Sequence, residues 1–228
     1  MASSAFTPVP PPAYSETDPT KENQSRQFII VRDVSGSTGY YKDCPGGKSR
    51  AEYMVEILYE TAQEALSIDQ DGKITYCTFS SPGKHTINEN IDINQFSKIL
   101  AETQIGGTTF ATQLFKELFA KYISDRKAGI NDKWSIIVFL DGEFNDKEEF
   151  ATCIAEFTKQ LNTPFDIKIE LIQVGNDQSA KNFLQFLDDE LVSQFKAKHD
   201  IVDTKSIEWL LKYGPKNIFK EMLEEKFN

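Results

Sequence analysis

Three oxygen-bearing side chains occupy alternate positions early in the chain, at Asp33, Ser35 and Ser37. They follow four apolar or β-branched residues in a row, Phe28 to Val31, a pattern typical of a strand buried on both faces. A tight turn at the end of such a strand can aim all three oxygens at one point. Because no nitrogen or sulfur ligand is offered, this set suits a hard cation such as Mg²⁺ or Mn²⁺ better than zinc.

The same spacing also has an ordinary structural explanation. Asp and Ser are common in turns and at helix starts, because their side chains hydrogen-bond nearby backbone groups. Two later segments favour the metal. Asp141 ends the apolar run 134–141, and Thr108 follows two glycines in a turn that leads into a helix. The carboxyl ends of parallel strands meet at one edge of a sheet. We therefore predict one site with five ligands: Asp33, Ser35, Ser37, Thr108 and Asp141.

Strand-like and helix-like periodicities alternate along the rest of the chain. Strands are expected at 73–80, 134–141 and 165–175, with a weak edge segment near 85–87. Helices are expected at 50–67, after a cap at Asp92, after the glycine turn at 106–107, and at 147–161, 180–198, 206–213 and 215–227. The segment 39–49 is expected to be a loop. This alternation predicts an α/β fold with a doubly wound, mostly parallel central sheet flanked by helices.

Length, charge and cysteine content narrow the class of protein. The chain has 228 residues, which is enough for one α/β domain over 26–228, and a formal net charge of −10, which argues against nucleic-acid and anionic-membrane partners. Its three cysteines are an odd number at wide spacings, so we expect neither a disulfide framework nor a zinc site. There is no apolar run of membrane-spanning length and no signal-peptide pattern. We expect a cytoplasmic protein.

Residues 1–25 are rich in Pro, Ser, Thr and charge, and we interpret them as a flexible tail. Within this tail, Pro11 to Tyr14 spell PPAY, which resembles the PPxY ligand of WW domains. Such four-residue matches also arise by chance in proline-rich segments. A WW-domain partner and a solvated leader without a partner both remain open.

Three segments, DVSGST, GGTT and FLDGEFND, resemble the signature motifs of the von Willebrand factor type A domain. The likeness extends over most of residues 27–203. The later run IELIQVGNDQSAKNFLQFLDDELV, followed by HDIVDT, resembles an intracellular branch of that family. The resemblance implies an intact metal-ion-dependent adhesion site. Its ligands match, motif by motif, Asp33, Ser35 and Ser37, then Thr108, then Asp141.

The resemblance implies recognition rather than turnover. A Mg²⁺ (or Mn²⁺) ion with few direct anionic ligands keeps a coordination position that an Asp or Glu of a protein partner can fill. Thr38 stands where the family often has Met, and Leu140 where it often has Thr, but neither change removes a ligand oxygen. Several neighbours are expected to surround the site. Tyr40, Tyr41 and Lys42 are candidates for its rim, Glu143 and Asn145 for tuning it, and Asp146 for capping the helix that begins at Lys147.

Two other classes of function are alternatives to a binding module. A Mg²⁺- or Mn²⁺-dependent phosphoryl-transfer or hydrolytic enzyme would use the ion as a Lewis acid, and a metal-free scaffold would keep only the fold. The run GGKS at 46–49 lacks the first glycine of a phosphate loop, since Lys42 stands there. Neither His85 nor His199 lies in a catalytic motif. We therefore predict a non-enzymatic, metal-dependent protein-interaction module without catalytic residues.

Overall fold

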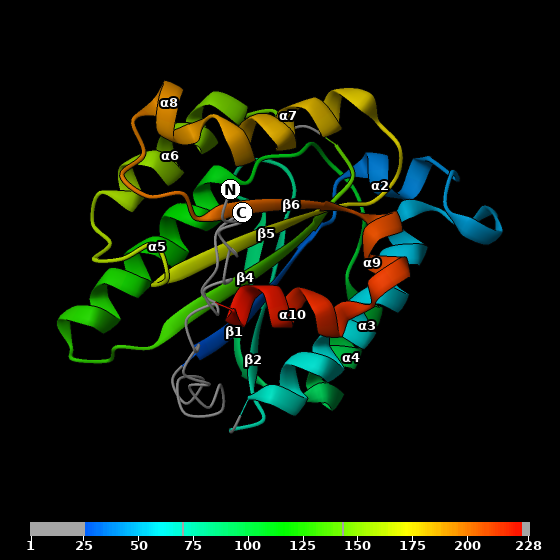
Figure 1. The fold of residues 1–228 in the computed structure, drawn as a ribbon. Helices are drawn as coiled ribbons and strands as arrows, with labels where there is room; N and C mark the ends of the chain where they lie inside the picture. The colour runs from blue at the N-terminus through cyan, green and yellow to red at the C-terminus, as the bar shows by residue number, and fades with distance from the viewer. Residues whose placement is uncertain (1–25, 70, 143, 225–228) are drawn as a thin grey trace, which may run out of the picture.

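A six-stranded sheet in the order β3-β2-β1-β4-β5-β6 lies at the centre of the computed structural model (Figure 1). The structure describes residues 26–69, 71–142 and 144–224, so the tail and its PPAY motif lie outside the described residues. The strands are β1 (Arg26–Asp33), β2 (Ile74–Phe79), β3 (His85–Ile91), β4 (Lys133–Leu140), β5 (Ile167–Gln173) and β6 (Val202–Ser206). All neighbouring strands are parallel except β2 and β3. The expected α/β class is confirmed.

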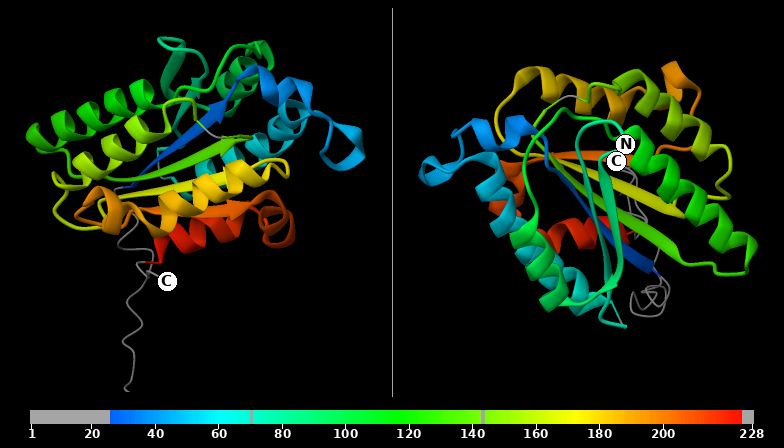
Figure 2. Two further views of the ribbon diagram at one scale, coloured as in Figure 1. Left: turned by 90° about the horizontal axis from the view of Figure 1, so that it is seen from above. Right: turned by 180° about the vertical axis from the view of Figure 1, so that it is seen from behind.

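Helices cover both faces of this sheet (Figure 2). One face carries α5 (Thr112–Lys127), α6 (Lys147–Thr158), α7 (Gln178–Asp189) and α8 (Leu191–Phe195). The other face carries α3 (Arg50–Ile68), α4 (Ile93–Glu102), α9 (Ile207–Tyr213) and α10 (Pro215–Leu223). The short helix α2 (Gly36–Tyr40) and the 3₁₀ turn η2 (Pro45–Gly47) lie between β1 and α3. The chain order reverses between β1 and β4, which is where ligands of open α/β sheets bind.

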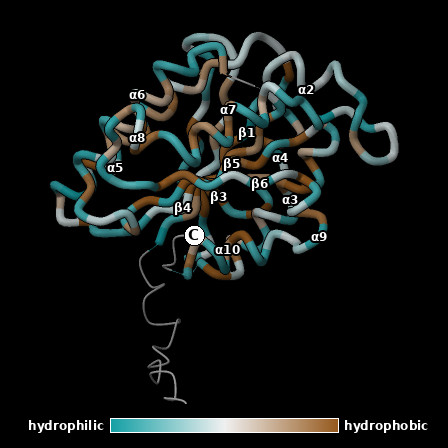
Figure 3. The backbone as a smooth tube through the Cα atoms, turned by 45° about the horizontal axis from the view of Figure 1, so that its top comes forward, coloured by the Kyte–Doolittle hydropathy of each residue, from teal (hydrophilic) through white to brown (hydrophobic). Residues whose placement is uncertain are grey.

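Strand β1 shows why a continuous apolar run was needed at the centre of the sheet. Ile29 and Val31 pack against the face covered by α5 to α8, whereas Phe28 and Ile30 pack against the face covered by α3, α4, α9 and α10. All four side chains are buried, since each face of a parallel sheet is covered by helices. Hydrophobic residues accordingly concentrate on the central strands in Figure 3.

Two helices begin at residues whose side chains cap them, and these capping residues lie next to the helices in the sequence. The Asp92 carboxylate accepts hydrogen bonds from the backbone N–H groups of Asn94 and Gln95, at 2.9 and 3.0 Å. In return, the Gln95 side chain accepts from the Asp92 N–H at 3.0 Å. This reciprocal capping box confirms the expected cap of α4, and Ser49 and Glu52 form a second one at the start of α3.

Three local expectations were wrong. Residues 39 and 40 of the loop expected at 39–49 instead end α2, and the single helix expected at 180–198 is divided into α7 and α8 around Glu190. Strand β6 was missed because it contains one buried apolar residue, Val202, and four polar ones, so it carries no strand periodicity. Among the residues that the structure describes, no helix combines the length and the apolar character needed to cross a membrane.

Candidate metal-binding site

Asp33 ends β1 at the carboxyl edge of the sheet, and its side chain is fully buried. Its Oδ1 atom accepts a hydrogen bond of 2.8 Å from the backbone N–H of Ser35, which fixes the start of α2. Its Oδ2 atom is buried and has no hydrogen-bond partner among the described residues. A buried carboxylate oxygen without a donor is costly, so this atom favours a proton, a water molecule or a cation as its partner.

Asp141 follows β4, the neighbouring strand, and is also fully buried. Its Oδ1 atom accepts a 3.0 Å hydrogen bond from the Ser37 hydroxyl, and the Ser37 and Ser35 hydroxyl oxygens lie 3.1 Å apart. Four of the five predicted ligands, Asp33, Ser35, Ser37 and Asp141, are therefore joined by hydrogen bonds at one point. The sequence separation between Ser37 and Asp141 is 104 residues, and adjacent parallel strands bring them together.

Thr108 lies in the third loop of the site, but its side chain has a different contact. Its hydroxyl donates to Ser81 Oγ at 3.3 Å, and its backbone N–H donates to the same oxygen at 3.2 Å. The loop itself is beside the other ligands, because the Gly36 N–H donates to the Gly107 carbonyl at 2.9 Å. Ser81 was missed by the sequence analysis, although it follows β2 at the same edge, where strand ends gather polar groups.

The second glycine of the Gly106-Gly107 pair is required by this geometry. Gly107 has a φ of +91°, a conformation that L side chains rarely adopt. A Cβ atom at Gly107 would lie 2.3 Å from Ser81 Oγ, the atom that holds Thr108. The glycine therefore allows the Thr108 loop to approach both Ser81 and α2.

Asn145 and Asp146 hold the loop that carries Thr108. The Asn145 amide oxygen accepts from the Thr109 N–H at 2.8 Å, and the Asn145 N–H donates to the Thr109 carbonyl at 2.7 Å. The Asp146 carboxylate accepts from the N–H groups of Ala111 and Thr112, at 3.3 and 2.9 Å. Asp146 therefore caps α5, whereas the sequence analysis assigned it to α6, because the start of α5 is close only in space. Glu143 lies outside the described residues.

The two buried carboxyls strongly affect each other. Burial, followed by the negative charge of Asp141, raises the pKa of Asp33 to about 7. Burial also raises the pKa of Asp141, although the Arg50 guanidinium and the Ser37 hydroxyl oppose that shift. When Asp33 is protonated, it can donate to Asp141. A proton between the two side chains is thus one way to satisfy the pair, and a divalent cation is another.

Arg50 is a further site residue that sequence reasoning did not find. It begins α3, and its side chain is buried. Its Nη1 atom donates to the Asp141 carbonyl at 3.1 Å and to Asp141 Oδ2 at 3.2 Å. Nothing in the local sequence signals this contact, since 91 residues separate the two side chains.

The expected rim residues lie beside the site. Tyr40 ends α2 with 79% of its surface exposed, and Tyr41 follows it with 48% exposed. Their rings pack edge to face with centroids 5.2 Å apart. The Tyr41 N–H donates to the Ser37 carbonyl at 3.3 Å, so the pair is attached directly to a predicted ligand. Exposed aromatic side chains are frequent at protein interfaces.

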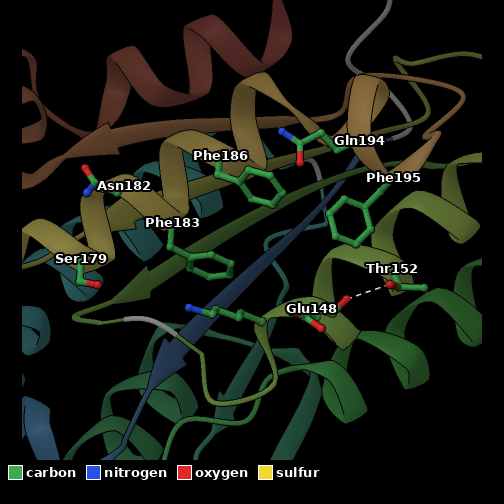
Figure 4. A pocket seen from close by; sticks show the side chains of 9 residues that line it. Glu148, Thr152, Ser179, Asn182, Phe183, Phe186, Gln194 and Phe195 are labelled. Atoms are coloured by element: carbon green, nitrogen blue, oxygen red, sulfur yellow. Dashed lines mark hydrogen bonds between the residues drawn. The ribbon is translucent and has the colours of Figure 1, made fainter.

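An aromatic groove of about 510 Å³ lies elsewhere, between α6, α7 and α8 (Figure 4). Phe183 and Phe186 of α7 and Phe195 of α8 point into it, opposite Glu148 and Thr152 of α6. It shares no residue with the site described above. Its lining offers mainly apolar contact surface.

The donor set at the sheet edge differs from that of a zinc or haem site. No group of three or more His, Cys, Asp or Glu side chains in the described parts of the chain could hold a metal ion. The site at α2 instead combines two carboxylates with serine hydroxyls. Such all-oxygen donors fit Mg²⁺ or Mn²⁺, and the unpartnered Asp33 Oδ2 supplies an atom that a cation could satisfy.

Comparison with known proteins identifies the fold. No protein-family model and no curated protein sequence matches the chain. The structure resembles the SpRpn10 VWA domain with a TM-score of 0.57 and 12% identity, over 80% of this chain and 88% of that chain. It resembles the manganese-loaded TRAP protein of Plasmodium vivax with a TM-score of 0.57 and 14% identity, over 88% and 74%.

A third similar structure is the BatB protein of Bacteroides thetaiotaomicron, with a TM-score of 0.55 and 15% identity, over 87% of this chain and 99% of that chain. At these identities the likeness concerns the backbone, so it establishes architecture rather than activity. The chain has a von Willebrand factor type A-like fold.

Proposed function

We propose that this protein is a metal-dependent protein-interaction module of the cytoplasm and not an enzyme. Its ligands are Asp33, Ser35, Ser37, Thr108 and Asp141, and its partner is a protein that offers an Asp or Glu side chain. The observation that carries the proposal is the buried, unpartnered Oδ2 atom of Asp33 beside a second buried carboxyl, within a cluster of hydroxyl oxygens.

Each ligand has a defined role in holding Mg²⁺ or Mn²⁺. Asp33 and Asp141 supply negative charge, and the Ser35 and Ser37 hydroxyls supply neutral oxygen donors. Ser37 donates its proton to Asp141, which leaves its oxygen lone pairs for a cation. A bound ion supplies an electrophilic coordination position that attracts a carboxylate. The Thr108 hydroxyl donates to Ser81 through a long hydrogen bond of 3.3 Å. Thr108 joins the ligand set when its hydroxyl turns from Ser81 toward the ion.

Further observations support a binding role. One protein with a similar fold was crystallised in a manganese-loaded form, and another is a pilus adhesin, SpaC of Lactobacillus rhamnosus GG. Both are distant relatives in structure, so they support the proposal only by analogy. Cys44, Cys77 and Cys153 are all free in the structure.

Metal-dependent stabilisation and partner capture test this proposal. Because Mg²⁺ or Mn²⁺ binds only the folded state, an ion at 100 times its dissociation constant should add about 2.7 kcal/mol of stability. The same ion should allow a partner to be captured from lysate, and EDTA should release it. Asp33→Ala should abolish both effects. Asp132→Asn, which removes one negative charge at the start of β4, should retain both.

The proposal fails if EDTA and millimolar metal give the same melting curve and the same captured proteins. A phosphatase assay with Mg²⁺ and Mn²⁺ on the same samples separates binding from turnover. Phosphate release by the wild type that Asp33→Ala abolishes would favour the enzyme alternative.

Metal affinity should depend on pH through Asp33. The pKa of its carboxyl is raised to about 7, so a proton occupies the site below that pH and must leave when a cation binds. The apparent affinity for Mn²⁺ should therefore fall by roughly tenfold per pH unit as the pH drops below 7, and change little above pH 8. Calorimetric titrations at pH 6, 7 and 8 measure this dependence. Equal affinities at pH 6 and pH 8 would contradict it.

A further inference from the structure

The Arg50 guanidinium connects the site to the loop between α2 and α3. On one side its Nη1 atom contacts Asp141, through the carbonyl and the carboxylate. On the other side its Nε and Nη2 atoms donate to the two carboxylate oxygens of Asp43, at 3.0 and 2.6 Å. This two-bond arrangement with Asp43 is the strongest geometry available to an arginine. Arg50 is therefore held by hydrogen bonds to Asp141 on one side and to Asp43 on the other.

Two further contacts confine the same guanidinium. The Tyr41 ring lies over it, with the Arg50 Cζ atom 4.5 Å from the ring centroid. On the side of the β5–α7 loop, Gly175 has a φ of +100°, and a Cβ atom there would lie 2.4 Å from Arg50 Nε. The absence of a side chain at Gly175 therefore makes the space that the arginine fills.

Both carboxylate oxygens of Asp141 and its carbonyl consequently accept hydrogen bonds from Ser37 or Arg50. Its Oδ1 atom accepts from Ser37, and its Oδ2 atom and carbonyl accept from Arg50. Asp33 differs, because its Oδ2 atom has no hydrogen-bond partner in the part of the chain that the structure describes. The two buried carboxyls are thus not equivalent, because one is held by a cationic side chain and the other is available.

We infer that Arg50 is a positioning residue: it holds Asp141 as the hydrogen-bond acceptor of Ser37, so that Asp141 acts on the ion through Ser37 and water rather than by direct contact. This inference rests on the proposed function. With Asp141 held by Arg50, the ion receives less anionic charge and keeps a position for the partner's carboxylate. The positive charge of Arg50 also opposes ion binding. Arg50 therefore weakens metal affinity while it preserves the electrophilic position.

Arg50→Gln distinguishes this role from simple structural support. Freed from Arg50, Asp141 can turn toward the ion, so Mn²⁺ should bind roughly tenfold more tightly. At the same time the bound Mn²⁺ should retain fewer exchangeable waters, which water-proton relaxation measures. Lys48→Gln is the matched control, because it removes the same charge from an exposed side chain that pairs with Glu56. It should leave both quantities unchanged.

Gly175→Ala provides a second variant that changes no charge. Its added methyl group should displace the guanidinium from Asp141, and the bound Mn²⁺ should again lose exchangeable water. This variant also decides the question if Arg50→Gln does not fold. Because this variant keeps the arginine, it distinguishes the effect of moving the guanidinium from the effect of removing its positive charge.

The outcomes separate the two proposals. If wild-type protein binds no Mn²⁺, the proposed function fails. If wild type binds Mn²⁺ but Arg50→Gln binds it more weakly, or the hydration of the bound ion is unchanged in both variants, the role of Arg50 is overturned and the proposed function stands. Tighter binding together with fewer exchangeable waters supports the positioning role.

Discussion

Asp33→Asn is expected to make the folded protein more stable than wild type in EDTA at pH 8, while abolishing its response to Mg²⁺. Burial and the charge of Asp141 raise the pKa of Asp33 from 3.8 to about 7. At pH 8 the wild type must hold this carboxylate ionised in the folded state. At about 1.4 kcal/mol per pKa unit, the cost is on the order of 4 kcal/mol.

An asparagine at this position should reproduce the protonated acid. Its oxygen can still accept from the Ser35 N–H, and its amide nitrogen can donate to Asp141. It has no negative charge to offer a cation. The substitution should therefore satisfy the orphaned atom, remove the buried charge and eliminate metal binding in one step.

The stability gained by Asp33→Asn should depend on pH, and the pKa of Asp33 gives the direction of that dependence. The folded-state pKa of Asp33 lies above the unfolded value, so between about pH 4 and pH 7 the folded state binds a proton that the unfolded state has lost. This contribution to wild-type stability therefore declines as the pH rises through that range. The stability of Asp33→Asn does not decline in this way. Its stability relative to wild type should therefore be largest at pH 8 and about a third as large at pH 5.

Thermal melts in EDTA at pH 5 and pH 8 measure this difference. For a protein of this size, about 4 kcal/mol corresponds to roughly 8 °C or more in melting temperature. Asp132→Asn, which removes a carboxylate at the opposite end of β4, serves as the control and should show no such gain. A lower stability of Asp33→Asn than of wild type at pH 8 would show that the buried carboxylate is not the cost assigned to it.

Phe144→Ala should cause the largest loss of stability, about 3 to 5 kcal/mol. The Phe144 ring is buried and packs edge to face against Phe79, Phe150 and Phe183, with ring centroids 5.6, 4.5 and 5.6 Å away. Removing it leaves a cavity beneath the loop that begins at Asp141. We therefore expect weaker Mn²⁺ binding in the variant even under conditions where it is fully folded.

Urea unfolding in EDTA measures the stability change, and a Mn²⁺ titration at low temperature measures the effect on the site. Phe144→Leu is the matched variant, because it retains most of the apolar volume and should cost less than about half as much. A loss below about 1 kcal/mol for Phe144→Ala would mean that the surrounding aromatic side chains collapse into the space.

The sequence predicted the features that depend on local chemistry. Asp92 was recognised as a cap because its partners lie two and three residues away. The Asp33, Ser35 and Ser37 cluster was recognised because a strand end and its turn are contiguous, and the rule for parallel strands then placed Asp141 beside it.

Features that depend on distant packing were not predicted. Asp146 was assigned to the helix next to it in sequence, whereas it caps α5, more than thirty positions away. The contact of Arg50 with Asp141 depends on the space above Gly175, which only the assembled β5–α7 loop creates. Strand β6 forms because β5 offers hydrogen bonds and Asp188 of α7 accepts from the N–H and hydroxyl of Thr204, and neither fact is visible in VDTKS.

The hydrogen bonds around the site form a closed circuit through three loops. Gly36 is bonded to Gly107, Thr109 to Asn145, and Arg50 to Asp141. Because Asn145 and Asp141 follow β4, an amino-terminal fragment that stops before β4 lacks the partners of Thr109 and Arg50 and cannot complete the site. Cation binding should consequently report on completed assembly of the whole chain, and it should vanish at the first step of unfolding that detaches any one loop.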